Sequence, residues 1–358
     1  MTGAGAAAGQ RPAPADPAPL RSALLRWYDA NRRALPWRRD RDPYRIWVAE
    51  VMLQQTRLDV VIPKYERFVR TFPDVAALAR ASQERVLAAW SGLGYYTRAR
   101  SLHRAARALR ALGRDTFPRE AAVAAALPGV GRYTLGAVLS IAYDLPYVAL
   151  DANVVRVLSR LACLPRPDTR GEPQLALAER LLERIRPGDW NQALMELGET
   201  ICLPRAPRCA TCPLEPSCAA RTRAATHLFP QPKPRRATER VRVVLSVLHD
   251  GAGGVLLERG AFPYLPHLWL PPTAVGEHAR TPVGAHAGSF RHAILHRQLA
   301  VEVYVRRCSA ARLASAAAAG PHGADDRERR VFSRAGRARI GRSSLMTKAL
   351  ALALRERG

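Results

Sequence analysis

The chain has 358 residues, enough for two domains with separate hydrophobic cores, and its 56 Lys and Arg against 30 Asp and Glu give a formal net charge of +26. This excess of positive charge favours nucleic acid or another anionic surface as the partner. No apolar stretch reaches the roughly 18 residues of a membrane span, and six cysteines, four of them within residues 202–218, argue against a secreted disulfide scaffold.

The N-terminal residues 1–19 lack the basic and apolar segments of a signal peptide and are predicted to be a disordered leader. Residues 20–218 show helical periodicity throughout, with turns at Gly and Pro pairs. We predict helices over Leu20–Ala30, Pro43–Phe72, Ser82–Trp90, Tyr96–Leu112, Arg119–Leu127, Arg132–Tyr143, Asn153–Leu161 and Pro173–Ile185.

The segment 219–238 alternates proline with basic residues and is predicted to be a linker. A mixed α+β domain is expected over 239–358, because β-branched or alternating runs occur at 241–248, 255–259 and 299–305. A short helix is predicted at Leu345–Arg355. The Ala-, Arg- and Gly-rich segment 308–342 indicates no clear element.

Residues 127–138 read L-P-G-V-G-R-Y-T-L-G-A-V, and the two glycines of P-G-V-G allow a sharp backbone turn. A helix beginning after this turn would direct its first N–H groups outward, as a site for an anion such as a DNA phosphate. Gly129, Val130 and Gly131 are therefore candidate DNA-binding residues. Asp151 lies in A-L-D-A-N-V, a short apolar run that would bring its carboxylate close to the turn. A plain turn between core helices, with Asp151 as a helix cap, fits the same residues.

Four cysteines follow an apolar helix in the pattern C-x6-C-x2-C-x5-C: Cys202, Cys209, Cys212 and Cys218. Four thiolates can hold zinc or an iron–sulfur cluster. Zinc sites usually take cysteines as two close pairs, and only one such pair is present. The spacing resembles the loop of the endonuclease III superfamily, and this resemblance implies a [4Fe–4S] cluster. The remaining Cys163 and Cys308 are expected to be ordinary buried thiols.

The hairpin, the aspartate and the cysteine loop follow one another as in helix-hairpin-helix DNA glycosylases, which residues 20–218 resemble. Within that superfamily the chain is most similar to MutY-type adenine DNA glycosylases. The likeness is carried by L-P-W-R (35–38), P-Y-R-I-W-V-A-E-V-M-L-Q-Q-T (43–56), W-S-G-L-G-Y-Y-T-R-A-R (90–100) and N-Q-A-L-M-E-L-G (191–198). It implies a mostly α helix-hairpin-helix glycosylase fold with a [4Fe–4S] loop (202–218), followed by a smaller α+β Nudix-like domain.

Glu50 stands in the run W-V-A-E-V-M-L, so a helix would set its carboxyl group among apolar neighbours. Desolvation raises the pKa of a carboxyl group, which suits a residue that delivers a proton near neutral pH. The pattern alone favours a surface glutamate on an amphipathic helix. The resemblance reverses this preference, because the matching glutamate of MutY-type enzymes protonates the adenine ring and makes the base a better leaving group.

The resemblance also assigns roles around the hairpin. Asp151 would stabilise the positive charge that develops on the deoxyribose as the base leaves, and Asn153 and Tyr133 would position the sugar and the acid. The family commonly reads D-G-N-V where this chain has alanine at 152, which is tolerable unless that position needs positive φ. Strand-cleaving relatives carry a lysine at the place of Tyr133, and no lysine lies between residues 64 and 233. We therefore expect a monofunctional glycosylase without lysine-dependent lyase activity.

Excision requires that the base leave the duplex, at a cost of a few kcal/mol. Gln55 and Tyr95 match family residues that wedge into the DNA. Four residues match the adenine pocket: Arg33, Trp37, Leu53 and Glu196. The two apolar members of this set also fit an ordinary core, and the two charged members a solvated ion pair.

The C-terminal region, 239–358, resembles the Nudix-like domain with which adenine glycosylases recognise 8-oxoguanine, through G-G-V-L-L-E-R-G (253–260) and L-W-L-P (268–271). The G-x5-E-x7-R-E-x-x-E-E hydrolase motif does not occur, which favours binding over hydrolysis of nucleoside diphosphates. The family's lesion-reading loop is typically F-S-H, and I-L-H (294–296) aligns with it. Leucine cannot replace the serine hydrogen bond, so His296 or Arg297 is expected to supply the contact.

These features predict a monomeric glycosylase that removes adenine mispaired with 8-oxoguanine or guanine from double-stranded DNA, in a bacterial cytoplasm at the nucleoid and without a membrane partner. Two alternatives remain. One is a glycosylase of the same superfamily that removes thymine or uracil from mispairs with guanine. The other is a non-catalytic DNA-binding protein with a structural hairpin and cluster. The presence of both Glu50 and Asp151 argues against the second alternative, since binding alone needs neither.

Overall fold

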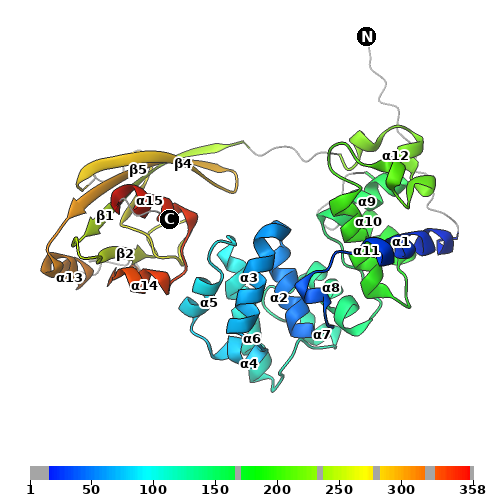
Figure 1. Ribbon diagram of the computed structural model, residues 1–358, viewed down its shortest axis with the longest axis horizontal. Helices are drawn as coiled ribbons and strands as arrows, with labels where there is room; N and C mark the ends of the chain where they lie inside the picture. The colour runs from blue at the N-terminus through cyan, green and yellow to red at the C-terminus, as the bar shows by residue number, and fades with distance from the viewer. Residues whose placement is uncertain (1–15, 166–170, 232–236, 277–282, 319–326, 355–358) are drawn as a thin grey trace, which may run out of the picture. The chain divides into compact units, whose positions relative to one another are not determined.

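The computed structural model describes residues 16–165, 171–231, 237–276, 283–318 and 327–354 (Figure 1). The chain forms two compact units, one of residues 1–80 and 101–234, the other of residues 81–100 and 235–358. Most of the predicted leader (1–15) and part of the predicted linker (232–236) lie outside the described residues. No helix within the described ranges is long and apolar enough to cross a membrane.

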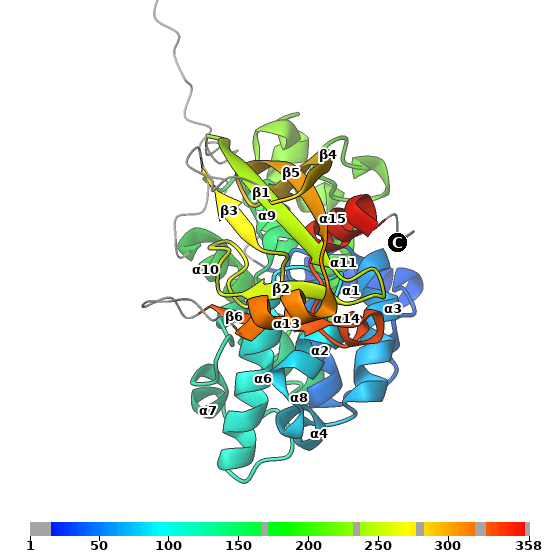
Figure 2. The ribbon, with the colours of Figure 1, turned by 90° about the vertical axis from the view of Figure 1, so that its left-hand side faces the viewer.

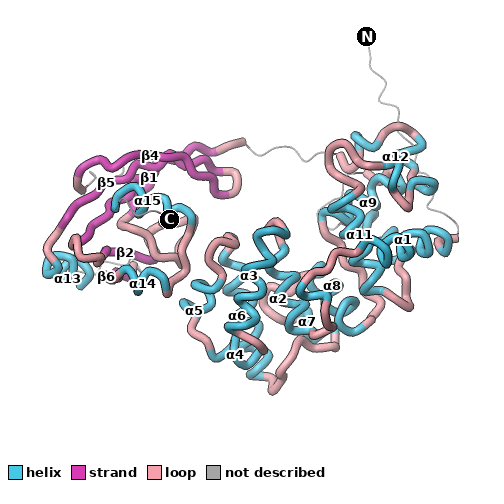
Figure 3. The backbone as a smooth tube through the Cα atoms, in the orientation of Figure 1, coloured by secondary structure: helices cyan, strands magenta, loops and turns pink. Residues whose placement is uncertain are grey.

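The first unit is helical, as Figure 3 shows for the residues before the first strand. Its α8 covers Arg132–Tyr143, the same bounds that the sequence predicts. The other elements of this unit are α1 (Ala18–Asn31), η1 (Pro36–Arg38), α2 (Pro43–Leu53), α3 (Leu58–Thr71), α4 (Val75–Arg80), most of α6 (Tyr96–Ala111), α7 (Ala121–Ala125), α9 (Ala152–Ala162), α10 (Glu172–Leu181), α11 (Pro187–Thr200), η2 (Cys209–Thr211), η3 (Glu215–Ser217), α12 (Ala219–Thr222) and η4 (Thr226–Leu228).

The single helix predicted over 43–72 is wrong, because the chain forms α2 and α3 with a turn between them. Gln55 adopts a left-handed conformation with φ of 56°, which a right-handed helix cannot contain. The Thr56 N–H donates to the carbonyl oxygen of Leu53 (3.2 Å) and closes the turn. No Gly or Pro marks this break, and apolar periodicity continues across it, so the pattern alone could not locate it.

Two further predicted boundaries differ from the structure. The helix predicted to reach Ile185 ends at Leu181 as α10, and the Ile185 side chain beyond it is 85% exposed. The segment predicted as a linker begins with α12 and η4, so its first part is helical. A helix at Val75–Arg80, which no sequence signal indicated, is present as α4.

A core of the first unit lies among α1, α9, α10 and α11 (Figure 1). α9 supplies Val154, Leu158 and Leu161 at helical spacing, and α11 supplies the fully buried Trp190. Each aliphatic side chain removed from water in this way contributes roughly 1.5–3 kcal/mol. This packing fixes the start of α9 against α11, which matters for the residues described below.

The second unit contains a sheet with the strand order β4–β5–β1–β2–β6, and β3 pairs with β1. β5 runs parallel to β1, with Val243 opposite Val301, whereas β4 and β2 run antiparallel to their neighbours. β1, β5 and β4 lie side by side in Figure 2. The strands are β1 (Glu239–His249), β2 (Val255–Arg259), β3 (Thr273–Val275), β4 (Ala285–Ile294), β5 (Arg297–Arg307) and β6 (Glu328–Phe332).

Helix α15 (Ser344–Leu354) packs against β1, β4 and β5 with Leu345, Met346 and Leu350 buried. The segment 308–342 holds α13 (Ala310–Ala318), β6 and α14 (Arg334–Ala338), with residues 319–326 outside the described part. The unit also includes α5 (Gln83–Ala89) and the residues after it as far as Arg100. Among these, the Tyr96 hydroxyl donates to the Arg342 carbonyl oxygen (2.6 Å). A mixed α+β arrangement after residue 239 is therefore confirmed.

Candidate active site

The glycine turn before α8 leaves the start of that helix accessible. Gly129 has φ of 80°, and a Cβ there would lie 2.5 Å from the Cβ of Ser101, so only glycine fits. Gly131 is the N-cap of α8 with φ of −91°, and it has no side chain that could cap the helix. Val130 is buried beneath the turn. The two glycines therefore expose backbone, while the valine anchors it.

Glu50 lies on α2 and is 4% exposed, so the predicted apolar setting is confirmed. α2 packs on α8, and the Tyr133 hydroxyl donates a hydrogen bond to Glu50 Oε2. Burial raises the pKa of Glu50 to about 7, partly opposed by this hydrogen bond. Burial also raises the pKa of Tyr133 well above its usual value, so the phenol remains a neutral donor. Near neutral pH, Glu50 can therefore hold a proton and release it.

Asp151 is the N-cap residue of α9, as one of the two sequence interpretations held. Its Oδ1 accepts from the Val154 N–H (2.7 Å) and its Oδ2 from the Asn153 amide (3.0 Å). Burial raises the pKa of this carboxyl group, and the two hydrogen bonds act against that rise. The negative charge of Asp151 is also among the causes that raise the pKa of Glu50. Capping and a role near Glu50 are therefore compatible.

Alanine at 152 causes no strain beside this aspartate. Ala152 is the first residue of α9 and is not among the residues with positive φ. A glycine is therefore not required at this position, and the departure from D-G-N-V does not disturb the backbone.

Arg156 connects Asn153 to the start of the cysteine loop, and sequence reasoning missed it. Its Nη2 donates to Asn153 Oδ1 (2.9 Å) and to the Gly198 carbonyl oxygen (2.8 Å), and its Nε donates to the Cys202 carbonyl oxygen (2.8 Å). A basic residue within a strongly amphipathic helix is the only signal that the sequence offers for it. Through Asn153, these bonds fix the orientation of the Asp151 carboxylate.

Gly198 permits the close approach of α11 to α9. A Cβ at this position would lie 2.6 Å from the Cβ of Asn153, a separation that real side chains do not adopt. The backbone of α11 therefore contacts the residue that holds the Asp151 carboxylate.

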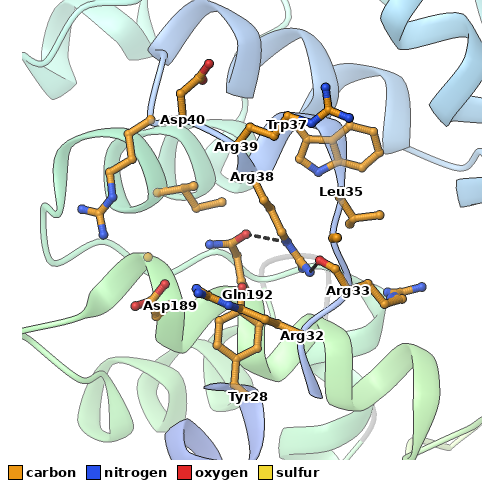
Figure 4. A pocket seen from close by; sticks show the side chains of 14 residues that line it. Tyr28, Arg32, Arg33, Leu35, Trp37, Arg38, Arg39, Asp40, Asp189 and Gln192 are labelled. Atoms are coloured by element: carbon orange, nitrogen blue, oxygen red, sulfur yellow. Dashed lines mark hydrogen bonds between the residues drawn. The ribbon is translucent and has the colours of Figure 1, made fainter. Parts of the chain in front are cut away.

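Two of the residues predicted for the adenine pocket, Arg33 and Glu196, form a partly buried ion pair. Glu196 is 1% exposed, so the solvated ion pair considered above is wrong for this residue. Arg33 and Arg38 both bind its carboxylate, Arg38 at 2.9 Å. Trp37 is buried, with its ring edge-to-face against Tyr65 and the ring centroids 5.1 Å apart. Arg38 was not predicted as a site residue, and Figure 4 shows its side chain donating to the Arg33 carbonyl oxygen (3.1 Å).

Leu53, the fourth residue predicted for that pocket, is the last residue of α2 and is half-buried. It lies one helical turn after Glu50, so the two side chains are on the same side of α2.

Gln55 and Tyr95, the predicted wedge residues, share an unusual backbone conformation. Both side chains are exposed, Tyr95 by 44%, and their φ angles are 56° and 46°. Such left-handed residues cost free energy and tend to occur at functional sites. Gln55 belongs to the first unit and Tyr95 to the second.

The four clustered cysteines line one small cavity of about 30 Å³. All six cysteines are free thiols, and Cys163 is buried as predicted, whereas Cys308 is only partly buried. Burial and the nearby thiols raise the pKa of Cys212 to about 12. The buried Arg160 donates to Cys202 Sγ (3.3 Å) and to the Leu203 carbonyl oxygen (2.7 Å). Within the described residues, no group of three or more His, Cys, Asp or Glu side chains is placed so that it could hold a metal ion.

His296 and Arg297 lie at the start of β5, where Glu239 contacts both, Arg297 Nε at 2.7 Å. The Arg297 guanidinium also stacks 4.6 Å above the Tyr264 ring. A pocket of about 460 Å³ in the same unit is lined by Tyr95, Ile294 and Leu295 among others, but not by His296 or Arg297. Leu295 is 70% exposed at the turn between β4 and β5.

Comparison with known proteins gives matches to part of the chain. A family model described as HhH-GPD superfamily base excision DNA repair protein matches residues 48–183. The adenine DNA glycosylase of Mus musculus is 45% identical over 219 residues, which cover 58% of this chain and 42% of that protein. The adenine DNA glycosylase of Buchnera aphidicola subsp. Baizongia pistaciae is 38% identical over 200 residues, or 54% of this chain and 56% of that protein.

Among solved structures, a thermostable thymine-DNA glycosylase matches with a TM-score of 0.52 and 28% sequence identity. The match covers 58% of this chain and 97% of that one. The chain spans less than half the length of the mammalian relatives that it matches, between 40% and 43%.

Proposed function

Because residues 48–183 belong to the HhH-GPD superfamily of base excision DNA repair proteins, we propose that this chain is a monofunctional adenine DNA glycosylase. Its substrate is adenine mispaired with 8-oxoguanine or guanine in double-stranded DNA, and its reaction is hydrolysis of the N-glycosidic bond. The observation that carries this proposal is the pairing of a buried, protonatable Glu50 with Asp151 behind the accessible start of α8.

Glu50 acts as the general acid. Its pKa of about 7 leaves a large fraction protonated at neutral pH, and a proton delivered to a ring nitrogen of adenine weakens the bond to the sugar. The Tyr133 hydroxyl donates to Glu50 Oε2. This hydrogen bond orients the carboxyl group of Glu50, whose Oε1 is then left to deliver the proton. After the base has left, Glu50 carries the negative charge that the proton leaves behind.

Asp151 stabilises the cationic sugar. The deoxyribose gains oxocarbenium character as the bond breaks, and a carboxylate held in low dielectric lowers the energy of that state. The hydrogen bonds from Val154 and Asn153 hold the carboxylate in place without supplying a full positive charge to cancel it. Gly129 and Gly131 expose backbone N–H groups to the adjoining DNA phosphate.

No lysine is available to cut the strand. Tyr133 occupies the position where strand-cleaving relatives carry the amine, and no lysine occurs from residue 65 to residue 232. A Schiff base with the sugar therefore cannot form there, and the product is an abasic site in an intact strand.

The cysteine loop has the donor set for a [4Fe–4S] cluster. Cys202, Cys209, Cys212 and Cys218 line the same cavity, and Arg160 donates to one of the sulfurs, as befits a thiolate ligand. Bound there, the cluster would supply a fixed cross-link among the turns of residues 202–218. Arg156 then transmits the position of this loop to Asn153.

A second candidate reaction is removal of thymine or uracil from mispairs with guanine. The 28% identity to a thymine-DNA glycosylase structure favours it. The 45% identity to an adenine DNA glycosylase over 219 residues favours adenine. A buried acid with a pKa of about 7 also suits adenine, whose ring nitrogens accept protons readily.

The second unit acts as the Nudix-like reader of the opposite strand. The pocket lined by Tyr95, Ile294 and Leu295 is the proposed place for the lesion, and Tyr95 and Gln55 are the wedges. His296 and Arg297 remain the proposed polar contacts, which requires that they exchange Glu239 for the lesion. We further propose a monomer that works at the bacterial nucleoid.

The test uses four duplexes, with A·8-oxoguanine, A·G, T·G and U·G mispairs, each assayed with and without alkali. We expect adenine to be released from the A·8-oxoguanine and A·G duplexes, and we expect strand breaks at the resulting abasic sites only after alkali. Release of thymine or uracil in its place would establish the second candidate, and breaks without alkali would refute the monofunctional reaction. Asp151→Asn should lose turnover and retain DNA binding, and normal turnover by this variant would refute its assigned role.

A further inference from the structure

Tyr95 stands at the end of the turn between α5 and α6, in a backbone conformation that needs support. Gly94 and Tyr95 are consecutive left-handed residues, with φ of 68° and 46°. Glycine adopts such a conformation at little cost, whereas tyrosine does so only when its surroundings hold it. The ring that this backbone carries is 44% exposed. Contacts elsewhere in the turn must therefore keep Tyr95 in place.

The side chain of Arg98, in the first turn of α6, supplies such contacts. Its Nη2 donates to the carbonyl oxygens of Leu93 (3.2 Å) and Gly94 (3.3 Å), the two residues before Tyr95. The Arg98 backbone N–H donates to the Tyr95 carbonyl oxygen (2.9 Å). Arg98 therefore holds the peptide groups on both sides of the Tyr95 α-carbon.

The guanidinium group of Arg98 also connects the exposed ring to a buried one. Its central carbon lies 5.3 Å from the centroid of the Tyr95 ring and 5.6 Å from that of the Trp90 ring. Trp90 is fully buried, and its indole N–H donates to the Gly94 carbonyl oxygen (3.1 Å). Burial lowers the pKa of Arg98 to about 10, so the group keeps its charge at neutral pH and attracts the π systems of both rings.

A position fixed in advance matters for a side chain that enters DNA. The duplex must be opened before Tyr95 can stack in it, which costs free energy. Ordering the turn and the ring at the same moment would add to that cost, and holding them beforehand removes the addition. Leu93, Gly94 and Tyr95 also line the pocket of about 460 Å³ described above. The contacts of Arg98 therefore fix a part of the wall of that pocket together with the wedge.

We propose that Arg98 is a positioning residue for Tyr95, and that it holds the ring and the turn in the conformation that enters the duplex. This inference rests on the proposed function of Tyr95 as a wedge. Arg98 acts through Tyr95 and takes no part in the bond-breaking step. A direct contact between Arg98 and a DNA phosphate is the alternative, and it predicts a different salt dependence of binding.

A double-mutant cycle tests this role in the full chain. The variants are Arg98→Gln, Tyr95→Ala and their combination, each carrying Asp151→Asn so that no base is released during the measurement. The probe is an A·8-oxoguanine duplex with 2-aminopurine beside the 8-oxoguanine, because 2-aminopurine becomes more fluorescent when it is unstacked. Affinity for this duplex and for an undamaged one is measured in parallel. The matched control is Arg107→Gln, which removes an exposed arginine further along α6.

Arg98→Gln should lower the fluorescence increase and reduce the preference for the mispaired duplex over the undamaged one by roughly fivefold, relative to the natural side chain and to Arg107→Gln. Added to Tyr95→Ala, it should cause no further loss. Its affinity for the undamaged duplex should equal that of Arg107→Gln. Melting followed by circular dichroism verifies that the variants are folded. If Arg98→Gln is not folded, Arg98→Lys takes its place, because lysine keeps the charge but cannot bond both carbonyl groups and face both rings.

An equal loss in the presence and in the absence of the Tyr95 ring would refute the proposal, and a salt dependence reduced by about one phosphate contact would assign Arg98 to the DNA backbone instead. Unchanged fluorescence and preference in Arg98→Gln would also refute it. If Tyr95→Ala itself changes neither quantity, the wedge role is wrong, and the role of Arg98 falls with it. A chain that shows the expected cycle but, with Asp151 restored, releases no base from any duplex would refute only the proposed glycosylase reaction.

Discussion

Two glutamates of the first unit are almost completely buried, and their surroundings are opposite. Glu196 is 1% exposed, and the guanidinium groups of Arg33 and Arg38 compensate its charge. Glu50 is 4% exposed, and the neutral hydroxyl of Tyr133 is bonded to it. Burial raises the pKa of Glu50 to about 7, and the more distant charge of Arg38 opposes this rise only in part. A glutamate side chain is thus a member of an ion pair at position 196 and a proton donor at position 50.

The difference shows that burial alone does not make a catalytic acid. A buried charge must be paired or neutralised by a proton. The partner therefore decides the outcome, and each partner here comes from a segment distant in the sequence. The following experiments exchange or remove these partners.

Glu50→Gln should reduce the single-turnover rate of base release by about 10²- to 10⁴-fold, because the acid is lost while its shape is kept. The measurement is release of the mispaired base from a saturating duplex, with binding followed in parallel. Retention of more than a tenth of the natural rate would show that Glu50 is not the acid.

Glu196→Gln should lower the free energy of unfolding by about 3–5 kcal/mol, because Arg33 and Arg38 lose the carboxylate that compensates them. Denaturant unfolding at neutral pH measures this change. An unchanged midpoint would mean that the arginines find water or another partner, and that the cluster contributes little.

Glu50→Gln should have the opposite effect on stability. Below pH 4.5 the Glu50 carboxyl group is protonated in both the folded and the unfolded chain, so the variant has no stability advantage over the natural chain from this ionisation. Between pH 4.5 and 7 the unfolded chain ionises while the folded chain keeps its proton, and the natural protein loses stability. Above pH 7 glutamine should be favoured by about 3 kcal/mol, from 1.36 kcal/mol for each unit of pKa. The prediction is contradicted if the difference in unfolding free energy between the variant and the natural chain is the same at pH 5 as at pH 8.

The rate of base release should fall as pH rises through 7, approaching about tenfold for each further unit, because only the protonated Glu50 can donate. Single-turnover rates from pH 6 to pH 9 measure this limb. A rate that stays level to pH 9 would assign the proton to another donor.

Tyr133→Phe should slow base release by about tenfold, since one orienting hydrogen bond is worth roughly 1–2 kcal/mol. This bond lowers the pKa of Glu50, so its removal should also move the alkaline limb to higher pH. If Tyr133 has only a structural role, Tyr133→Phe should change the unfolding free energy and leave the alkaline limb of the pH–rate profile unchanged.

Several of these features could be predicted from the sequence. The family resemblance, against the pattern alone, predicts that Glu50 is buried, and the glycine turn places the start of α8 at Arg132, as the structure has it. A helical glycosylase fold followed by an α+β unit is confirmed in outline, and the Nudix-like character of the second unit remains a prediction.

The partners could not be predicted. Tyr133 and Glu50 are 83 residues apart, and Arg38 and Glu196 are 158 apart, so only packing brings them together. Arg156 and Arg160 have the composition of a solvent-facing helix side, yet their guanidinium groups bind carbonyl oxygens of the cysteine loop. The left-handed Gln55 has no glycine to signal it.

The close packing of α9 against α11 depends on the absence of a side chain at Gly198. A methyl group at this position would meet Asn153 at 2.6 Å, so even alanine must displace the amide that holds Asp151. In a saturation mutagenesis screen, position 198 should therefore behave as an active-site position although glycine supplies no side chain to the site. Variants there would accumulate as folded protein that fails in repair, and a survey of expression levels alone would overlook them.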